Sequence, residues 1–179
     1  MPHIELSSGL PGIRSLVTYR PDTGKPLYEL AQILLRHDSP LSPADRELIA
    51  AYVSSLNACT FCMSSHAAAA RFLYQDENQM VDIVLEDYEN APISEKLKSL
   101  LLIAGKVQAD ARSVLESDVA HARQHGATDR DLHDTVLIAA TFCMFNRYVD
   151  GLATITPPAD DLNTWAAMGE RMGTRGYVI

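Results

Sequence analysis

The most restrictive feature of this 179-residue sequence is the spacing of its apolar residues. Segments in which apolar side chains recur every three or four positions follow one another through almost the whole chain, separated by short breaks rich in Pro, Gly or Asp. That period belongs to amphipathic helices, whereas a half-buried strand alternates every second residue, a pattern that no segment shows clearly. The sequence therefore predicts an all-α protein, a bundle of many helices around a shared core.

The first 26 residues are expected to differ from the rest. Residues 6–26 hold three glycines and three prolines, which interrupt regular elements. Residues 1–26 are therefore predicted to form an extended N-terminal arm, and residues 27–179 a single all-helical domain.

Start and stop signals divide that domain into helices. Ser42 and Ser94 are suited to cap helix N-termini, with Pro43 at a first helical position, and Gly126 is the residue expected just past a helix end. Gly173 and the residues after it are expected to form a loose tail. The predicted helices span approximately residues 27–36, 43–56, 58–74, 78–88, 94–108, 113–125, 128–153 (one long helix or a helix pair) and 160–172.

One predicted helix carries a group of reactive side chains. Cys59, Cys62 and His66 stand at positions i, i+3 and i+7, so that on a helix they share one face. The four alanines at 67–70 favour a helix there. Glu47, on the preceding helix, adds a carboxylate. Two thiols, an imidazole and a carboxylate are the parts of a dithiol redox centre with its own proton relay.

The position near a helix N-terminus is expected to favour the thiolate form. With Asn57 as the N-cap, both thiols lie in the first turns, where free backbone N–H groups and the helix dipole lower a thiol pKa. The dipole favours Cys59 as the reactive thiol, whereas a base four residues away, His66, favours Cys62. We give His66 more weight, because a base within hydrogen-bond reach both takes and returns the proton. Glu47 is then expected to orient His66.

Three other uses of the motif are open from the residues alone. Free cysteines are often buried, so Cys59 and Cys62 can be two small core residues. Together with His66 and Glu47 they also supply four ligands that zinc accepts, although structural zinc sites usually draw paired ligands from two separate loops. A structural disulfide is disfavoured by the odd number of cysteines, three. No metal and no other cofactor is therefore predicted.

Charge and hydropathy narrow the range of partners. A net charge of −8 disfavours a nucleic acid or an anionic membrane as the partner. No apolar run reaches the ~20 residues that span a bilayer, and residues 1–5 lack the basic and apolar regions of a signal peptide. The expected compartment is the cytoplasm, where a C-x-x-C motif is more often catalytic or metal-binding than structural.

A weak internal similarity suggests a duplication. Residues 45–48 (Asp-Arg-Glu-Leu) resemble residues 129–132 (Asp-Arg-Asp-Leu). Glu47 precedes Cys59 by twelve residues, and Asp131 precedes Cys143 by the same interval. Under this alignment residues 41–75 are a core redox unit that kept the two thiols. Residues 127–153 are a degenerate repeat of it that lost them. Cys143 is then a core residue and not a third redox thiol.

The same residues resemble a known family. Residues 41–50, continuing through 54–59 to Cys62 and His66, look like the core of the alkylhydroperoxidase AhpD-like proteins of the carboxymuconolactone decarboxylase superfamily. Within it, the chain is most similar to the peroxidase-related branch. The Glu, C-x-x-C, His core is the specific part of this likeness. It extends over most of the chain, through residues 10–13, 126–129 and 142–152.

The resemblance implies an all-helical fold, assembly into trimers or hexamers, and a thiol-dependent peroxidase activity. It also implies that Cys62 attacks the peroxide, that Cys59 resolves the sulfenic acid to a disulfide, and that His66 and Glu47 form the proton relay. The decarboxylase branch lacks the thiol pair, which disfavours that activity. Some AhpD-like proteins carry a further histidine between the cysteines, where this chain has Thr-Phe, so its relay would be simpler.

The predicted function is an alkyl hydroperoxide reductase whose disulfide is reduced by a lipoyl-bearing or thioredoxin-like partner. The alternatives are a thiol–disulfide oxidoreductase without peroxide chemistry and a redox-sensing oligomeric module without turnover. Three other features receive structural interpretations: His121 and His125 as part of a solvated face, Arg147 and Asp150 as a buried ion pair, and Trp165 as a packing anchor.

Overall fold

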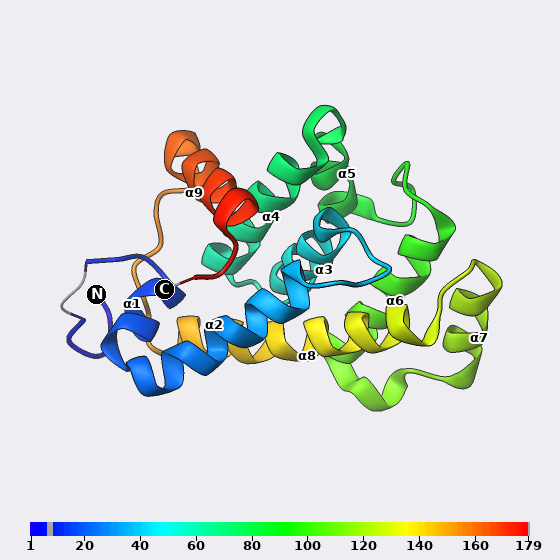
Figure 1. The fold of residues 1–179 in the computed structure, drawn as a ribbon, viewed down its shortest axis with the longest axis horizontal. Coiled ribbons are helices and arrows are strands. Elements are labelled where there is room, and N and C mark those ends of the chain that lie inside the picture. Colours follow the sequence, from blue (N-terminus) through cyan, green and yellow to red (C-terminus); the bar gives the residue numbers. More distant parts are fainter. Residues whose placement is uncertain (7–8, 179) are drawn as a thin grey trace.

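The computed structural model describes residues 1–6 and 9–178. Within these ranges the chain forms α-helices and two short 3-10 helices but no strand, which confirms the all-α prediction (Figure 1). The α-helices are α1 (Ile13–Tyr19), α2 (Pro21–Arg36), α3 (Pro43–Leu56), α4 (Thr60–Tyr74), α5 (Met80–Asp87), α6 (Glu95–Asp110), α7 (Glu116–Gln124), α8 (Asp129–Gly151) and α9 (Leu162–Arg175); the 3-10 helices are Gln75–Glu77 and Ala111–Ser113.

Helix α3 lies at the centre and packs against α4, α6 and α8. Every residue from Arg46 to Ser54 is buried, as expected of a helix surrounded by others. Its start is the predicted one: Ser42 caps the helix by accepting a hydrogen bond from the Asp45 backbone N–H at 3.0 Å, and Pro43 follows at the first position. Ser94 caps α6 in the same way, accepting from the Leu97 N–H at 3.2 Å. The main apolar core surrounds α3.

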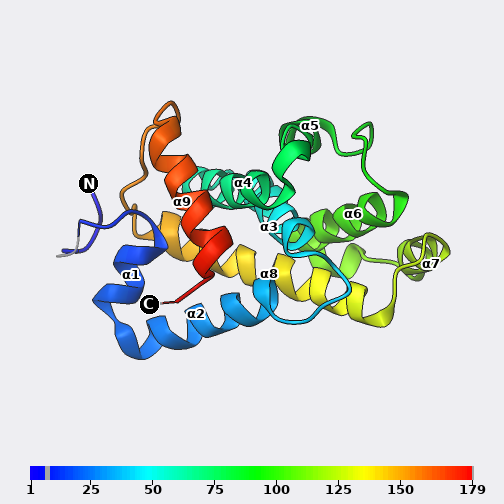
Figure 2. The same ribbon diagram turned by 45° about the horizontal axis from the view of Figure 1, so that its top comes forward.

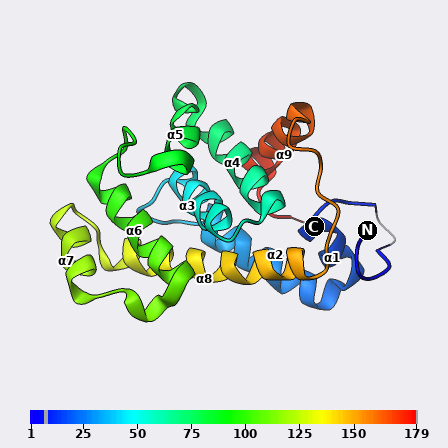
Figure 3. The same cartoon turned by 180° about the vertical axis from the view of Figure 1, so that it is seen from behind.

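Helix α8 runs along one side of the molecule, with α6 and α7 near its beginning and α1 and α2 near its end (Figures 1 and 3). Thr128 caps it in a capping box with Asp131, and the helix continues unbroken to Gly151, so this segment is one helix and not a pair. Among the helices of the described ranges, none is long and apolar enough to cross a membrane.

The expectation of an extended arm over residues 1–26 is wrong. Helix α1 and the first turns of α2 lie in this segment, and Leu16 and Val17 are buried. Proline at the first turn of a helix removes no hydrogen bond, and Pro21 occupies that position in α2. Gly24 lies against the Val17 backbone, where a larger residue would not fit. Here Pro and Gly allow two helices to pack closely. A segment rich in Pro and Gly can also be irregular, and composition alone does not separate these two cases.

The two segments of the expected repeat fold differently. Residues 41–75 form two helices, separated by a turn in which Ala58 adopts a left-handed backbone with φ 55°. The corresponding residues of 127–153 lie inside the continuous helix α8. Glu47 is in the middle of α3, whereas Asp131 belongs to the capping box of α8. The local structure therefore does not repeat.

A second, smaller apolar core holds the cysteines between α4, α9 and the N-terminal segment. Helix α9 packs closely on α4, because Gly169 leaves room for the Ala68 backbone. The ring of Phe61 occupies the space in front of Gly12, whose φ is 54°, and lies 6.1 Å from the ring of Trp165. Figure 2 shows α9 and the C-terminal tail next to the blue helices α1 and α2.

Candidate active site

The turn between α3 and α4 positions the two cysteines. Asn57 ends α3 instead of capping the cysteine helix, and its side chain donates to Asn146 Oδ1 at 2.8 Å. The left-handed Ala58 then reverses the chain, so that Cys59 is the N-cap residue of α4 and Cys62 lies in its first turn. The prediction that both thiols stand at a helix N-terminus is confirmed, although the cap is one of the cysteines themselves.

Both thiols are buried, and no disulfide joins them in this structure. Cys59 is 0% and Cys62 3% exposed. The hydrogen bond that the neutral Cys62 thiol donates to Cys59, together with burial, raises the pKa of Cys62 well above its usual value, and Asn146 lowers it only in part. The expected lowering by the helix N-terminus is therefore not realised for Cys62. Its neighbouring thiol and the apolar core outweigh the dipole.

The carboxylate and the imidazole meet as predicted. Glu47, fully buried on α3, faces His66 on α4, and Oε2 lies 2.6 Å from His66 Nδ1. Burial alone would raise the pKa of Glu47, but His66, Arg36 and Tyr177 together hold it below its usual value. An ionised carboxylate only accepts hydrogen bonds, so the shared proton belongs to Nδ1. The other ring nitrogen, Nε2, is then the one that can accept a proton.

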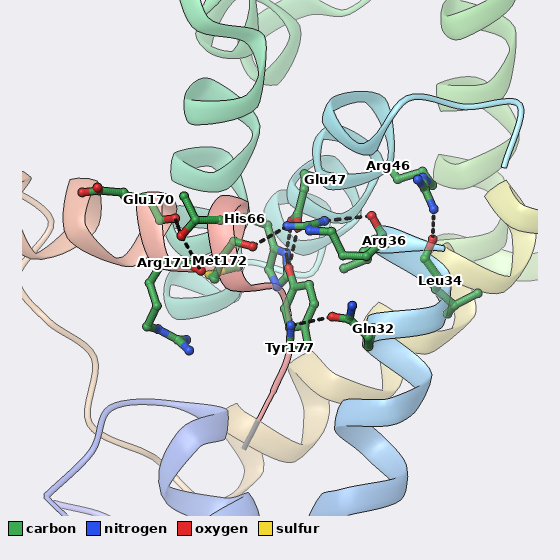
Figure 4. A network of polar contacts seen from close by, with 12 residues as sticks. Gln32, Leu34, Arg36, Arg46, Glu47, His66, Glu170, Arg171, Met172 and Tyr177 are labelled. Carbon is green, nitrogen blue, oxygen red and sulfur yellow. Dashed lines mark hydrogen bonds and ion pairs between the residues drawn. The ribbon is translucent and has the colours of Figure 1, made fainter. Parts of the chain in front are cut away.

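Two further residues complete this network, and neither was expected from the sequence (Figure 4). Arg36, at the end of α2, donates to Glu47 Oε1 at 2.5 Å and to the Met172 carbonyl at 2.9 Å. The Tyr177 hydroxyl donates to the same Oε1 at 2.6 Å, and its oxygen lies 3.2 Å from His66 Nδ1. Arg36 also lies over the Tyr177 ring, at 5.2 Å from its centroid.

The segment after α9 is docked and not the loose tail expected after Gly173. Gly176 has a positive φ of 65°, which turns the chain toward α2. The Tyr177 backbone N–H donates to Gln32 Oε1 at 2.7 Å, and its ring stacks on His66 at 6.0 Å between centroids. No local pattern signals this contact, since Tyr177 and Glu47 are 130 residues apart.

Cys62 and His66 open onto one small pocket. Its free volume is about 40 Å³, enough for a few water molecules. Its walls are mainly apolar, and Phe142 packs edge-on against His66 at 4.5 Å between centroids. His66 hydrogen-bonds Glu47 and Tyr177 but not Cys62, so the predicted direct contact from histidine to thiol is not present. The pocket lies between α1, α2, α4, α8, α9 and the tail.

The remaining candidates behave as structural residues. Trp165 is buried and donates from Nε1 to the Pro158 carbonyl at 2.9 Å, as a packing anchor should. His121 and His125 pack edge to face, 4.7 Å apart, on an exposed helix. Arg147 and Asp150 are both exposed and do not pair with each other, so the expected buried ion pair is absent. In the part of the chain that is described, no group of three or more His, Cys, Asp or Glu residues is arranged to hold a metal ion.

Comparison with known proteins gives a consistent result. Residues 21–87 match the model of the carboxymuconolactone decarboxylase family. An uncharacterised peroxidase-related protein from Ralstonia eutropha, with an alkylhydroperoxidase AhpD core, is 28% identical with a TM-score of 0.78, over 89% of this chain and 81% of that one. An uncharacterised peroxidase-related protein from Silicibacter sp. is 29% identical with a TM-score of 0.76, over 84% and 78%.

A protein of unknown function from Agrobacterium tumefaciens shares the fold, at 18% identity and a TM-score of 0.71 over 88% of this chain and 99% of that one. A search of the curated proteins found no match. The helical architecture is thus that of the AhpD-like proteins. The chain is thus similar to the carboxymuconolactone decarboxylase family over residues 21–87, and to peroxidase-related, AhpD-like proteins over most of its length.

Proposed function

We propose that the protein is a thiol-dependent peroxidase that reduces organic hydroperoxides. The observation that carries this proposal is the shared pocket: Cys62, adjacent to Cys59, opens onto the same apolar space as His66, which is held by a buried, ionised Glu47. This arrangement combines a nucleophile, a resolving thiol and a base with a fixed tautomer.

The proposed reaction has two steps. The Cys62 sulfur attacks the distal oxygen of ROOH, the O–O bond breaks, and the products are a Cys62 sulfenic acid and ROH. The thiol proton passes to Nε2 of His66, and the alkoxide leaving group takes up a proton from the imidazolium. The Cys59 thiol then condenses with the sulfenic acid, forming a disulfide and releasing water.

Because the pKa of Cys62 is raised, the thiol needs a base, His66, to remove its proton. The resting thiol keeps its proton in the closed, apolar pocket, so the thiolate forms only when a proton acceptor is in reach. A hydroperoxide or a water molecule in the pocket would link Cys62 to His66 Nε2, since the two side chains line the same space without touching through a hydrogen bond.

Cysteine variants test the proposal with cumene hydroperoxide as substrate and dihydrolipoamide as reductant. Cys62→Ser should abolish peroxide consumption, and Cys59→Ser should consume one equivalent and then stop with a sulfenic acid at Cys62, detected by mass spectrometry after dimedone trapping. Cys143→Ser, a partly buried thiol outside the pocket, should keep full turnover. Undiminished turnover by Cys62→Ser would refute the mechanism.

The same experiment separates the alternatives. Reduction of a small disulfide without any peroxide consumption would identify a thiol–disulfide oxidoreductase. Absence of both activities, with a peroxide-dependent change in oligomer size, would identify a redox-sensing module. Regeneration by a dithiol, either a lipoyl group or a thioredoxin-like protein, belongs to the proposal, because the disulfide must accept two electrons to restart the cycle.

Assembly into trimers or hexamers also belongs to the proposal. Apolar side chains on the surface support it: Phe72, Met144, Ile155 and Leu162 are between 40% and 74% exposed. Size-exclusion chromatography with light scattering should give three or six times the monomer mass of 19.7 kDa.

A further inference from the structure

The pocket that holds Cys62 is also lined by two arginines, Arg14 on α1 and Arg171 on α9. Neither guanidinium has a hydrogen-bond or ion-pair partner within residues 1–6 and 9–178. Six other arginines pair with carboxylates, and even the exposed Arg112 does so. In a chain with 23 acidic and 15 basic residues, two unpaired guanidiniums at one pocket are a distinct feature.

A third donor lies with them. Tyr28, on α2, lines the same pocket and is only 8% exposed, yet its hydroxyl makes no hydrogen bond to any described residue. The charges of Arg171 and Arg14 both act on this hydroxyl. Figure 4 shows that the Arg171 side chain extends away from the Glu47 network. Three helices thus bring these donors together, and none of the described residues supplies an acceptor for them.

The two thiol-side residues are buried more deeply than the two arginines, and this difference sets the orientation of a ligand in the pocket. Cys62 and His66 are 3% and 8% exposed, whereas Arg14 and Arg171 are partly exposed and lie nearer to solvent. The inner walls are apolar, with Phe61, Phe142 and Phe145 among them. A ligand that satisfies this pocket carries its anionic group at the mouth and an apolar segment toward the thiol.

We infer that Arg14, Arg171 and Tyr28 form a carboxylate subsite, and that the protein prefers hydroperoxides of carboxylic acids, such as fatty acid hydroperoxides, over neutral ones. This inference rests on the proposed function, since it names the substrate class of the same site. The carboxylate accepts hydrogen bonds from the two guanidiniums and the Tyr28 hydroxyl, and the hydroperoxide end reaches Cys62. The free volume of about 40 Å³ admits only the reacting end, so the acid group stays at the entrance.

Matched substrates test the preference. The second-order rate constant kcat/KM of the wild-type protein should be roughly tenfold higher for 8-hydroperoxyoctanoic acid, whose hydroperoxide is at the end of the chain, than for its methyl ester, because charge-assisted hydrogen bonds are lost with the ester. In the double variant Arg14→Gln/Arg171→Gln the ratio of the acid rate constant to the ester rate constant should fall to about one. Arg175→Gln, which removes a charge of the same helix outside the pocket, should keep the preference.

A binding measurement separates this inference from the proposed function. Octanoate should protect Cys62 from N-ethylmaleimide, read by peptide mass spectrometry, at roughly tenfold lower concentration than octanol, and the double variant should lose the difference. If octanoate protects Cys62 but no hydroperoxide is turned over, the carboxylate subsite is supported and the proposed peroxidase activity is refuted. If acid and ester are turned over at equal rates, and octanoate and octanol protect Cys62 equally, the carboxylate subsite is refuted and the proposed peroxidase activity is retained. An Arg175→Gln variant as defective as the double variant would also overturn the subsite.

Discussion

Two buried ionisable side chains of the site have pKa values that are shifted in opposite directions. Glu47 is fully buried, yet its pKa is held below the usual value because His66, Arg36 and Tyr177 supply positive charge and donors. Cys62 is almost as buried, and its pKa is raised because its main partner is another thiol. The site thus keeps a permanent charge on the residue that orients the base, and keeps a proton on the nucleophile until the base removes it.

The thiol pair can be tested by its pH dependence. Because the hydrogen bond that the Cys62 thiol donates to Cys59 is the largest cause of the raised pKa of Cys62, Cys59→Ala should lower that pKa. Alkylation of Cys62 by iodoacetamide should then reach half of its maximal rate at a lower pH than in the wild-type protein. Cys143→Ala serves as the control and should leave the profile in place. An identical profile for Cys59→Ala would contradict the assignment.

Tyr177→Phe tests the tail residue as a positioning residue of the relay. The variant keeps the ring that stacks on His66 but loses the donor to Glu47 and the oxygen near Nδ1. We expect kcat/KM for cumene hydroperoxide to fall roughly tenfold and the pH profile of the rate to shift, with stability lower by about 1 kcal/mol. Tyr19→Phe, at an exposed tyrosine, should change none of these three quantities. A loss of stability with an unchanged pH profile would show a purely structural role.

At the residue scale, the sequence predicted those parts of the site that are close together along the chain. Cys59, Cys62 and His66 were placed by helical spacing, and Glu47 by its place on the preceding helix. Arg36 and Tyr177 were missed, because their contacts with Glu47 arise only from the packing of α2 and the tail against α3. Arginine and tyrosine are also common enough at helix ends and termini that neither residue stands out.

At the scale of the element, capping residues predicted the helix starts well. Ser42 and Ser94 cap as expected, because a cap depends on a few neighbouring residues. The N-terminal segment was mispredicted, since glycine there serves close packing: Gly24 admits the Val17 backbone, a contact between two helices. Close approach of this kind depends on tertiary structure and leaves no local signal.

Two glycines of α9 and α8 provide a matched test of this point. A β-carbon at Gly169 would lie 2.5 Å from the Ala68 carbonyl oxygen, whereas none of the neighbouring atoms lies within 4 Å of one at Gly151. Gly169→Ala should therefore destabilise the protein by about 1–3 kcal/mol, as overpacked sites do. Gly151→Ala should be neutral or stabilising by up to ~1 kcal/mol. Urea unfolding measures both, and equal effects would show that α9 is free to shift on α4.

At the scale of the whole molecule, the buried ion cluster links stability to pH. Because the pKa of folded Glu47 lies below its ordinary value of 4.5, the ionised carboxylate stabilises the fold above that pH. This contribution is lost as the pH falls through the folded pKa. The cluster joins α2, α3, α4 and the tail, so its loss weakens the contacts of all four.

Glu47→Gln makes this dependence measurable. At pH 7 the variant should be less stable by about 3 kcal/mol, because Arg36 is left buried without its counter-ion. The difference from the wild-type protein should shrink as the pH is lowered below about 4.5, where the wild-type carboxylate also takes up a proton. Urea midpoints across the pH range give the result, with the exposed Glu29→Gln as control. A difference that stays constant with pH would contradict the assignment of Glu47 as ionised.

The ring of Phe61 has a consequence for the packing around the two cysteines. Phe61 lies between the two cysteines in the chain, and its ring is confined by Gly12 on one side and Trp165 on the other. A backbone change at Cys59 or Cys62 that moved this ring would therefore press it against the segment before α1 or the start of α9. The same packing that encloses the two thiols thus also ties them to two elements far apart in the sequence, one at each end of the chain.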